Sequence, residues 1–285
     1  MKKIISTLFT FVLFLVTSLG FAQNENSLLW EISGNGLEKP SYVFGTIHMI
    51  CEEDYFFTEQ FGKALSNSEV LITEIDFTNM QEMMEMQQAI QSDISLKERL
   101  TNEQYKKLTS LLNEKLGLDI MMFDKVSESG IASMVTMKSF PCENFKMYEM
   151  ELLQKAMAEN KTFSGLESVK DQMKIMEDHL NIDASIKMLE ELGTDVDSNK
   201  EMVALYKEQN IDELLGLLKE SSYMNPKAYD EFVVNRNNNW VKKMPELMKN
   251  KSIFFAVGAA HLGSKDGVLD LLRAAGFKVE AINKN

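Results

Sequence analysis

The chain has 285 residues, 45% of them hydrophobic, so it is long enough to bury one large core or two ordinary ones. Its formal net charge is −13 at pH 7, which argues against nucleic acid and anionic membranes as partners because both repel an acidic protein. After the first 22 residues no stretch approaches the roughly 18 apolar residues of a membrane span, so we expect no stable membrane insertion.

Residues 1–22 have the pattern of a signal peptide. Lys2 and Lys3 form a basic start, residues 4–19 form an apolar segment, and Gly20-Phe21-Ala22 is a small-x-small cleavage site. We therefore expect an exported protein, periplasmic or extracellular after cleavage near Ala22. The remaining residues 23–285 would form one domain with 28 basic and 43 acidic residues.

The chain contains two cysteines, Cys51 and Cys142, and both follow the predicted cleavage site. Export places them in a compartment where disulfides persist, so we predict a bridge between them. The alternative is a pair of buried free thiols.

The first half of the chain begins with two predicted strands, residues 28–32 and 41–44. The second of these runs directly into Gly45-Thr46-Ile47-His48. A helix is expected from about 58 to 66.

A third strand, within residues 69–77, ends in the carboxylates Glu74 and Asp76. Strand alternation places positions i and i+2 on one face, so both are expected on the same face. Glu74 lies between Ile72 and Ile75, which favours burial near His48, whereas a solvated strand end is the equal alternative for Asp76.

Residues 79–250 are mainly helical, and several signals mark their boundaries. Thr101 and Gln104 form a capping box, and Gly117 ends that helix.

Carboxylates that could join a site are Glu149 and Glu151, on a helix from about 148 to 160, and Glu167, at the end of a strand-like segment, 161–167. A helix that begins at Ser168 carries His179, which is expected to be a solvated surface residue. A later helix, opened by Asn225-Pro226, carries Arg236, Asn237 and Trp240.

The C-terminal part repeats the pattern of the first half. Residues 253–257 form a continuous apolar run, typical of a buried central strand, and Gly258-Ala259-Ala260-His261 follows it. A helix, 267–276, and a last strand, 278–282, complete the chain. The Gly-x-x-His sequence thus follows a strand twice, more than two hundred residues apart, in a chain with three histidines.

Two histidines and Glu74, each after a strand, have the chemistry of a three-ligand metal site. The carboxyl ends of parallel strands meet at one edge of a sheet, so His48, Glu74 and His261 are expected in one coordination sphere. Three protein ligands leave a position for water, whose pKa a divalent ion lowers from about 15.7 toward 7. Nitrogen and oxygen ligands suit Mn, Co and Zn about equally. For each histidine alone, a hydrogen-bonded core residue is the alternative.

The chain resembles the TraB/GumN family in an ordered set of segments that spans nearly all of residues 23–285. These segments are LLWEISG (28–34), SYVFGTIHM (41–49), LITEIDF (71–77), GLESVKDQ (165–172), NRNNNW (235–240) and FFAVGAAHLGSKDG (254–267). Many relatives have GLET where this chain has GLES, a departure that leaves Glu167 in place.

The resemblance implies an α/β fold like that of the erythromycin esterase group. This is a mixed, largely parallel central sheet flanked by helices, with its core from 28–77, 161–167 and 252–282 and a large helical insertion within about 79–250. The related Tiki metalloproteases are described as Mn- or Co-dependent proteases with two Gly-x-x-His motifs and a Glu. His48, His261 and Glu74 match those positions.

The first interpretation is therefore an exported metal-dependent hydrolase, peptidase-like, acting on a peptide or small-molecule substrate. His48, Glu74 and His261 would hold the metal; if Glu74 acts as a base instead, Glu149, Glu151 or Glu167 would complete the site. Arg236 is expected to bind a substrate carboxylate or an oxyanion, together with Asn237 and Glu167, and an ordinary surface salt bridge is its alternative.

Two other interpretations stay open. One is a metal-independent, esterase-like hydrolase in which His48 is the general base. The other is a protein that binds or sequesters a peptide without turnover. The sequence assigns neither the substrate nor the oligomeric state.

Overall fold

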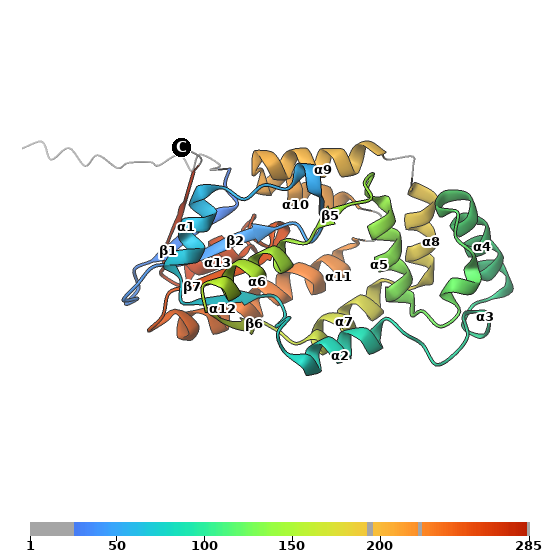
Figure 1. Cartoon of the computed structure of the whole chain (residues 1–285), viewed down its shortest axis with the longest axis horizontal. Helices are drawn as coiled ribbons and strands as arrows, with labels where there is room; N and C mark the ends of the chain where they lie inside the picture. The colour runs from blue at the N-terminus through green and yellow to red at the C-terminus, as the bar shows by residue number, and fades with distance from the viewer. Residues whose placement is uncertain (1–25, 193–195, 222–223, 284–285) are drawn as a thin grey trace, which may run out of the picture.

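A mixed six-stranded sheet forms the centre of the computed structural model, which describes residues 26–192, 196–221 and 224–283. The strand order is β6-β4-β7-β2-β1-β8. Figure 1 shows the sheet with its flanking helices. Neighbours among β6, β4, β7 and β2 are parallel, whereas β1 is antiparallel to both β2 and β8, so the predicted mixed, largely parallel α/β sheet is confirmed. The strands are β1 (Leu29–Ser33), β2 (Ser41–Thr46), β4 (Val70–Thr73), β6 (Thr162–Gly165), β7 (Ile253–Gly258) and β8 (Lys278–Ala281).

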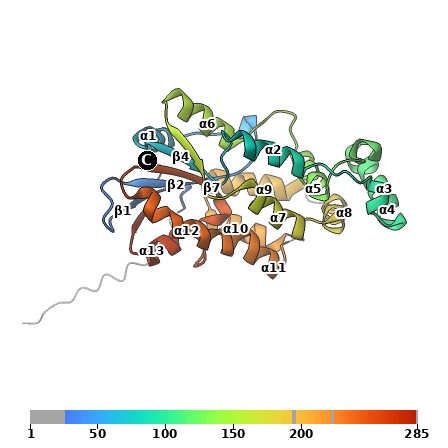
Figure 2. The same cartoon turned by 90° about the horizontal axis from the view of Figure 1, so that it is seen from below.

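The central strands are buried on both faces because helices cover the sheet on both sides. All residues of β2 and β4, and all of β7 except Gly258, are buried, as expected for near-continuous apolar runs in a parallel sheet. In Figure 2, α1 (Glu59–Asn67) and α6 (Tyr148–Ala158) lie on one side of the sheet. On the other side lie α12 (Asn235–Met248) and α13 (Val268–Ala274).

The chain between β4 and β7 is mainly helical. α3, α4, α5 and α8 extend away from the sheet (Figures 1 and 2) and enclose a separate apolar cluster that includes Leu108, Phe123 and Ile186. The predicted capping box of Thr101 and the left-handed cap at Gly117 are both confirmed. The remaining helices are α2 (Met80–Ala89), α3 (Leu96–Arg99), α4 (Asn102–Leu116), α5 (Glu128–Ser139), α7 (Val169–His179), α8 (Ile182–Glu191), α9 (Val196–Glu208), α10 (Ile211–Glu220) and α11 (Pro226–Tyr229), with 3-10 turns η1 (Glu52–Asp54), η2 (Ile120–Phe123) and η4 (Ala259–His261) and a π-helical turn η3 (Asp230–Val234).

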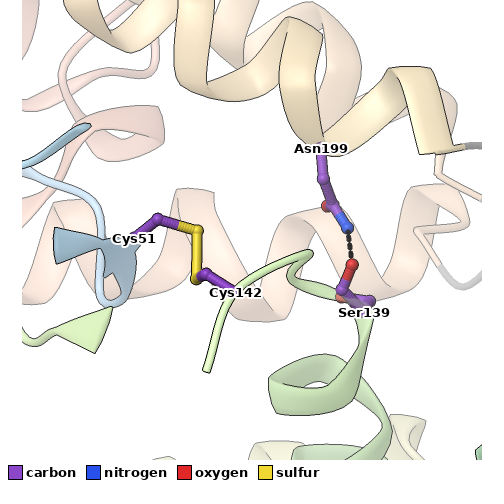
Figure 3. Close-up of a disulfide and its surroundings, with 4 residues drawn as sticks. All are labelled: Cys51, Ser139, Cys142 and Asn199. Carbon is purple, nitrogen blue, oxygen red and sulfur yellow. Dashed lines mark hydrogen bonds between the residues drawn. A yellow bond between two sulfur atoms is a disulfide. The ribbon is translucent and has the colours of Figure 1, made fainter. Parts of the chain in front are cut away.

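A disulfide joins Cys51 to Cys142 across 91 residues, as predicted (Figure 3). Cys51 belongs to β3 (Ile50–Cys51), which pairs with β5 (Phe145–Lys146) in a small second sheet. A loop of this length corresponds to a chain-entropy stabilisation of roughly 4 to 5 kcal/mol.

Two local predictions are wrong. β4 ends at Thr73, so strand alternation does not reach Glu74 and Asp76, and only Glu74 is buried. Asp76 instead accepts hydrogen bonds from the backbone N–H and the hydroxyl of Thr78 in an exposed turn. His179 is not solvated, because its side chain is 6% exposed and its Nε2 lies 2.8 Å from Glu231 Oε2.

In the part of the chain that the structure describes, no helix has the length and apolar character needed to cross a membrane.

The two Gly-x-x-His segments pack directly against each other at Gly45. A Cβ atom at this position would lie 3.0 Å from the Cα of Ala259 and 2.8 Å from Leu262 Cδ1. The absence of a side chain at Gly45 therefore allows the turn after β7 to approach the end of β2.

We predict that Gly45→Ala lowers the free energy of unfolding by about 1–3 kcal/mol, the cost of overpacking a close contact. The matched control is Gly62→Ala in α1, where a Cβ would meet only Phe57 Cε1, at 3.8 Å. Gly62→Ala is expected to be neutral or to stabilise by up to about 1 kcal/mol. Urea unfolding of both variants measures the difference, and equal effects would contradict the close-packing account.

Candidate active site

Three strand exits meet at the carboxyl edge of the sheet. Thr46 of β2 is in register with Gly258 of β7, so the turn that leads to His48 lies beside the turn that leads to His261. On the other side of β7, Thr73 of β4 is in register with Ala256, and Glu74 follows directly. Parallel pairing thus places all three side chains at one edge, where open α/β sheets bind ligands.

The three side chains surround Gly258. A Cβ atom on this glycine would lie 3.4 Å from Glu74 Oε1, 3.4 Å from His261 Cδ2 and 4.0 Å from His48 Nε2. The Gly258 N–H donates to Glu74 Oε1 over 2.8 Å, and His261 Nε2 lies 4.0 Å from the same oxygen. Glycine therefore leaves the space onto which two imidazoles and a carboxylate converge.

His48 is the accessible member of this group, with its side chain 68% exposed. Its Nδ1 lies 3.1 Å from Glu149 Oε1, which also accepts a hydrogen bond from the Thr46 hydroxyl at 2.9 Å. Surrounding protein atoms lower the pKa of His48, but the Glu149 carboxylate and, to a smaller extent, Glu74 outweigh them and raise this pKa to about 9. The contact with Glu149 directs Nε2 of His48 toward Gly258.

His261 is buried, and both of its ring nitrogens have partners. The amide nitrogen of Asn237 donates to the carbonyls of His261 and Asp266, so its oxygen is the acceptor that faces His261 Nδ1 at 2.7 Å. This assigns the proton to Nδ1 and leaves the lone pair on Nε2, which accepts from Arg236 Nη1 at 3.1 Å. Burial, and then the Arg236 charge, lower the pKa of His261 to about 3.

Arg236 connects the carboxylates of the site to His261. Its five N–H groups all donate to protein acceptors: Nε and Nη2 to Glu167, Nη2 also to Glu74, and Nη1 to His261 Nε2 and the Phe232 carbonyl. The side chain is 8% exposed, which excludes the surface salt bridge considered from the sequence. A substrate group could contact this guanidinium only by displacing one of these acceptors.

The two carboxylates that hold Arg236 have different electrostatic states. Burial alone would raise the pKa of Glu74, but Arg236, His261 and His48 reverse this and hold it well below its usual range. Burial raises the pKa of Glu167 above its ordinary value, against the opposing effect of Arg236. Gln172 donates to both carboxylates, at 3.1 Å to Glu74 and 3.3 Å to Glu167, and so connects them.

The other residues considered from the sequence divide into two groups. Glu149, Glu167 and Asn237 each contact a histidine or Arg236, and Glu167 also accepts from Trp240 Nε1 at 3.1 Å. Glu151 instead pairs with Lys146 at 3.0 Å and contacts none of the three predicted ligands.

Sequence reasoning missed Thr46 and Gln172. Both lie within the segments GTIH and GLESVKDQ that it selected, so their position in those segments was the available signal.

The arrangement offers a nitrogen lone pair on His261, a second imidazole on His48 and an ionised carboxylate on Glu74. Within the described residues no group of three His, Cys, Asp or Glu side chains is already arranged as a metal site. At His261, Arg236 Nη1 donates to Nε2, so another ligand can use this nitrogen only after the arginine moves.

These features define an α/β protein with a two-histidine, carboxylate-rich site at the carboxyl edge of a mostly parallel sheet. The chain belongs to the family described as TraB/PrgY/gumN family, whose sequence model matches residues 28–281. No curated protein and no solved structure matches the chain.

We predict that Arg236→Lys lowers the free energy of unfolding by about 2–4 kcal/mol, because one ammonium cannot replace five donors and leaves buried acceptors unpaired. For a domain of this size each kcal/mol corresponds to about 2 to 4 °C in melting temperature. Lys39→Gln is the matched control, since it removes an ion pair to Glu69 that is about half exposed on both sides, and should change stability by less than about 1 kcal/mol. An unchanged melting temperature in Arg236→Lys would show that the network is not structural.

The lowered pKa of His261 predicts acid sensitivity. The unfolded chain binds a proton at this residue below about pH 6.5, whereas the folded protein binds it only near pH 3. Stability is therefore fully present above pH 6.5 and is lost as the pH falls toward 3, by at most about 1.4 kcal/mol per pH unit from this group. Chemical unfolding of chelator-treated protein from pH 7 to 4 should show a shallower decline for His261→Asn than for wild type. Parallel curves would contradict this.

Proposed function

We propose that this protein is a metal-dependent hydrolase, peptidase-like, whose ion is held by His48, His261 and Glu74. One observation carries the proposal: each imidazole presents Nε2 to the site while Nδ1 faces an acceptor, Glu149 Oε1 for His48 and Asn237 Oδ1 for His261. Metal-ligating histidines typically have such a partner on the second nitrogen, which fixes the tautomer and the ring orientation.

The residues present fit a divalent ion. The space at Gly258, which a Cβ would fill, is bordered by both imidazoles and by Glu74 Oε1. Glu74, Glu149 and Glu167 supply three buried or nearly buried carboxylates. They outnumber the Arg236 guanidinium and a protonated His48, and this negative balance attracts cations. Nitrogen and oxygen donors suit Mn, Co or Zn.

When bound, such an ion supplies a hydroxide from water at neutral pH and polarises a substrate carbonyl. The chain's own groups have separable tasks. Glu149 and Asn237 orient the two imidazoles. Arg236 neutralises Glu74 and Glu167 and, through Nη1, occupies the His261 lone pair, so it must release this nitrogen for a ligand to bind there.

The raised pKa of His48 makes both the metal-dependent and the metal-independent proposal depend on pH. A general base must be unprotonated, and an imidazole with a pKa of about 9 is mostly protonated at pH 7. A metal ion competes with this proton, so its affinity should increase as the pH rises toward about 9.

A metal-independent, esterase-like hydrolase with His48 as general base is the second candidate. It is favoured by the pairing of the accessible His48 with Glu149 and by the Arg236 cation already located between Glu74 and His261. Its activity would persist in chelator and increase up to about pH 9. Binding of a peptide without turnover is the third interpretation.

Export remains part of the proposal. The predicted signal peptide, residues 1–22, lies outside the described residues, and a disulfide is a feature of proteins in oxidising compartments. Peptides or small molecules outside the cytoplasm are the proposed substrates.

We predict that protein purified without chelators contains about one Mn, Co or Zn per chain by mass spectrometry, and that the His48→Ala, His261→Ala double variant contains at least ten times less. His179→Gln is the matched control, because His179 pairs with Glu231 instead of the three ligands, and it should keep its metal. Hydrolysis of a peptide library should stop in chelator and return with added Mn, Co or Zn.

Equal metal content in wild type and double variant would overturn the metal assignment. Chelator-resistant turnover that is lost in His48→Ala would favour the general-base candidate. Peptide binding without any cleavage would favour the third interpretation.

A further inference from the structure

We infer that the Cys51–Cys142 disulfide is a positioning element of the site, which holds His48 against Glu149. This inference deepens the proposed function and rests on His48 acting there. The bridge connects two segments that each lead directly to one member of the pair. Cys51 lies three residues after His48, and Cys142 lies seven residues before Glu149.

Glu149 is held by the core independently of the bridge. It lies in the first turn of α6, whose residues Tyr148, Leu152 and Ala156 are fully buried in the main core. The Tyr148 hydroxyl also donates to the Phe56 carbonyl at 2.8 Å. Removal of the bridge should therefore leave this carboxylate in place.

His48 itself lies outside the core, although Ile50, two residues later, is buried in it. The His48 side chain is 68% exposed and lies in the segment 47–49, between β2 and the two-residue strand β3. The β2 end of this segment is fixed by the central sheet, and Ile47 packs against the main core. The other end is fixed through β3, where Ile50 is buried in the main core and Cys51 carries the bridge. The position of the imidazole thus depends on what holds β3.

β3 is attached to the segment that precedes α6 by a small β-ladder with β5 and by the disulfide. Ile50 pairs with Lys146, Cys51 pairs with Phe145, and the Glu52 N–H donates to the Asn144 carbonyl at 3.0 Å. A two-stranded ladder of this length is not stable alone in water. The covalent bond acts together with the burial of Ile50: it keeps Cys51 beside the segment that precedes α6, and so restricts the second end of the His48 segment.

The state of Glu149 indicates why such a constraint is needed. Its Oε2 is buried without a hydrogen-bond partner, so the carboxylate relies on Oε1 and its contacts with Thr46 and His48. An underpartnered buried carboxylate is costly, and a free His48 segment would open the site to water, which could solvate it. The bridge opposes this opening.

The bridge is accessible to a small reductant. Cys51 lines a cavity of about 450 Å3, together with Phe140, Val203 and Lys207, and Cys142 is partly exposed. Reduction by a dithiol transfers two electrons and two protons: the S–S bond breaks, Cys51 and Cys142 become thiols, and the dithiol becomes a cyclic disulfide.

The test compares the response to Glu149→Gln with and without the bridge. The protein is metal-free, and its histidine rings are labelled with 15N for NMR; three histidines make the assignment tractable, with His179→Gln and His261→Asn as references. In the bridged protein, Glu149→Gln should change the Nδ1 signal of His48. In Cys51→Ser, Cys142→Ser, the same substitution should produce no further change, because the pair is already separated.

Asn199→Ala is the matched control. Asn199 Nδ2 donates to the Ser139 carbonyl at 2.8 Å, three residues before Cys142, so this variant loosens the same region but keeps the bridge (Figure 3). It should retain the Glu149→Gln response. Native protein treated with a dithiol, with far-UV circular dichroism to confirm a folded sheet, serves as a second route if the double variant does not fold.

A retained response without the bridge, or its loss in Asn199→Ala, would overturn the inference. Where hydrolysis is measurable, removal of the bridge should lower it by about 10- to 100-fold, the usual effect of losing a residue that orients a site histidine. Loss of the NMR response in a protein without hydrolysis would support the positioning role and refute the proposed function. The positioning role of the disulfide and the proposed hydrolase function can therefore be refuted independently of each other.

Discussion

Parallel pairing of β7 with both β2 and β4 is the constraint on which the site depends. It aligns the ends of three strands, so that residues at positions 48, 74 and 261 converge although most of the chain separates them. The convergence also requires small residues. Gly45 allows the turn at Ala259 to pack against β2, and Gly258 leaves space where the three side chains meet. A side chain at either glycine would separate the strand exits or fill the site. Parallel strand pairing and the two glycines thus form the space of the site from the protein alone.

Electrostatics then determine what this space can hold. Arg236 donates to both Glu74 and Glu167, and it also occupies the Nε2 lone pair of His261. The two histidines are in opposite states: His261 is buried and neutral beside Arg236, whereas His48 is accessible and its pKa is raised by Glu149. A buried arginine with every donor used is a positioning group in this structure. The same cation stabilises two acidic groups that would otherwise repel each other, and it competes for the nitrogen that a metal ion would need.

Elements outside the central sheet position the site histidines as much as the sheet does. Asn237 on α12 orients one imidazole, while Glu149 on α6 orients the other, and these helices lie on opposite sides of the sheet (Figure 2). Each histidine is therefore positioned by a different layer of the fold. The small sheet of β3 and β5, with its disulfide, is the element that connects the His48 segment to α6.

Sequence patterns were sufficient for the buried strands and the disulfide, and the resemblance to the family supplied the fold class. Long apolar runs such as residues 253–257 can be recognised as strands because a strand buried on both faces needs no polar alternation. Two cysteines in a chain with a predicted signal peptide allow one intramolecular bridge. The repeated Gly-x-x-His pattern also selected the two histidines that the structure brings together.

Tertiary structure decided the rest. Whether Arg236 is a surface or a buried residue, which of Glu149, Glu151 and Glu167 reaches the site, and which nitrogen of His261 carries the proton all depend on neighbours from distant segments. Local periodicity also failed at Asp76, because β4 ends one residue before Glu74 and the chain then turns. Periodicity describes a residue's own element, whereas burial and protonation are set by the elements packed against it.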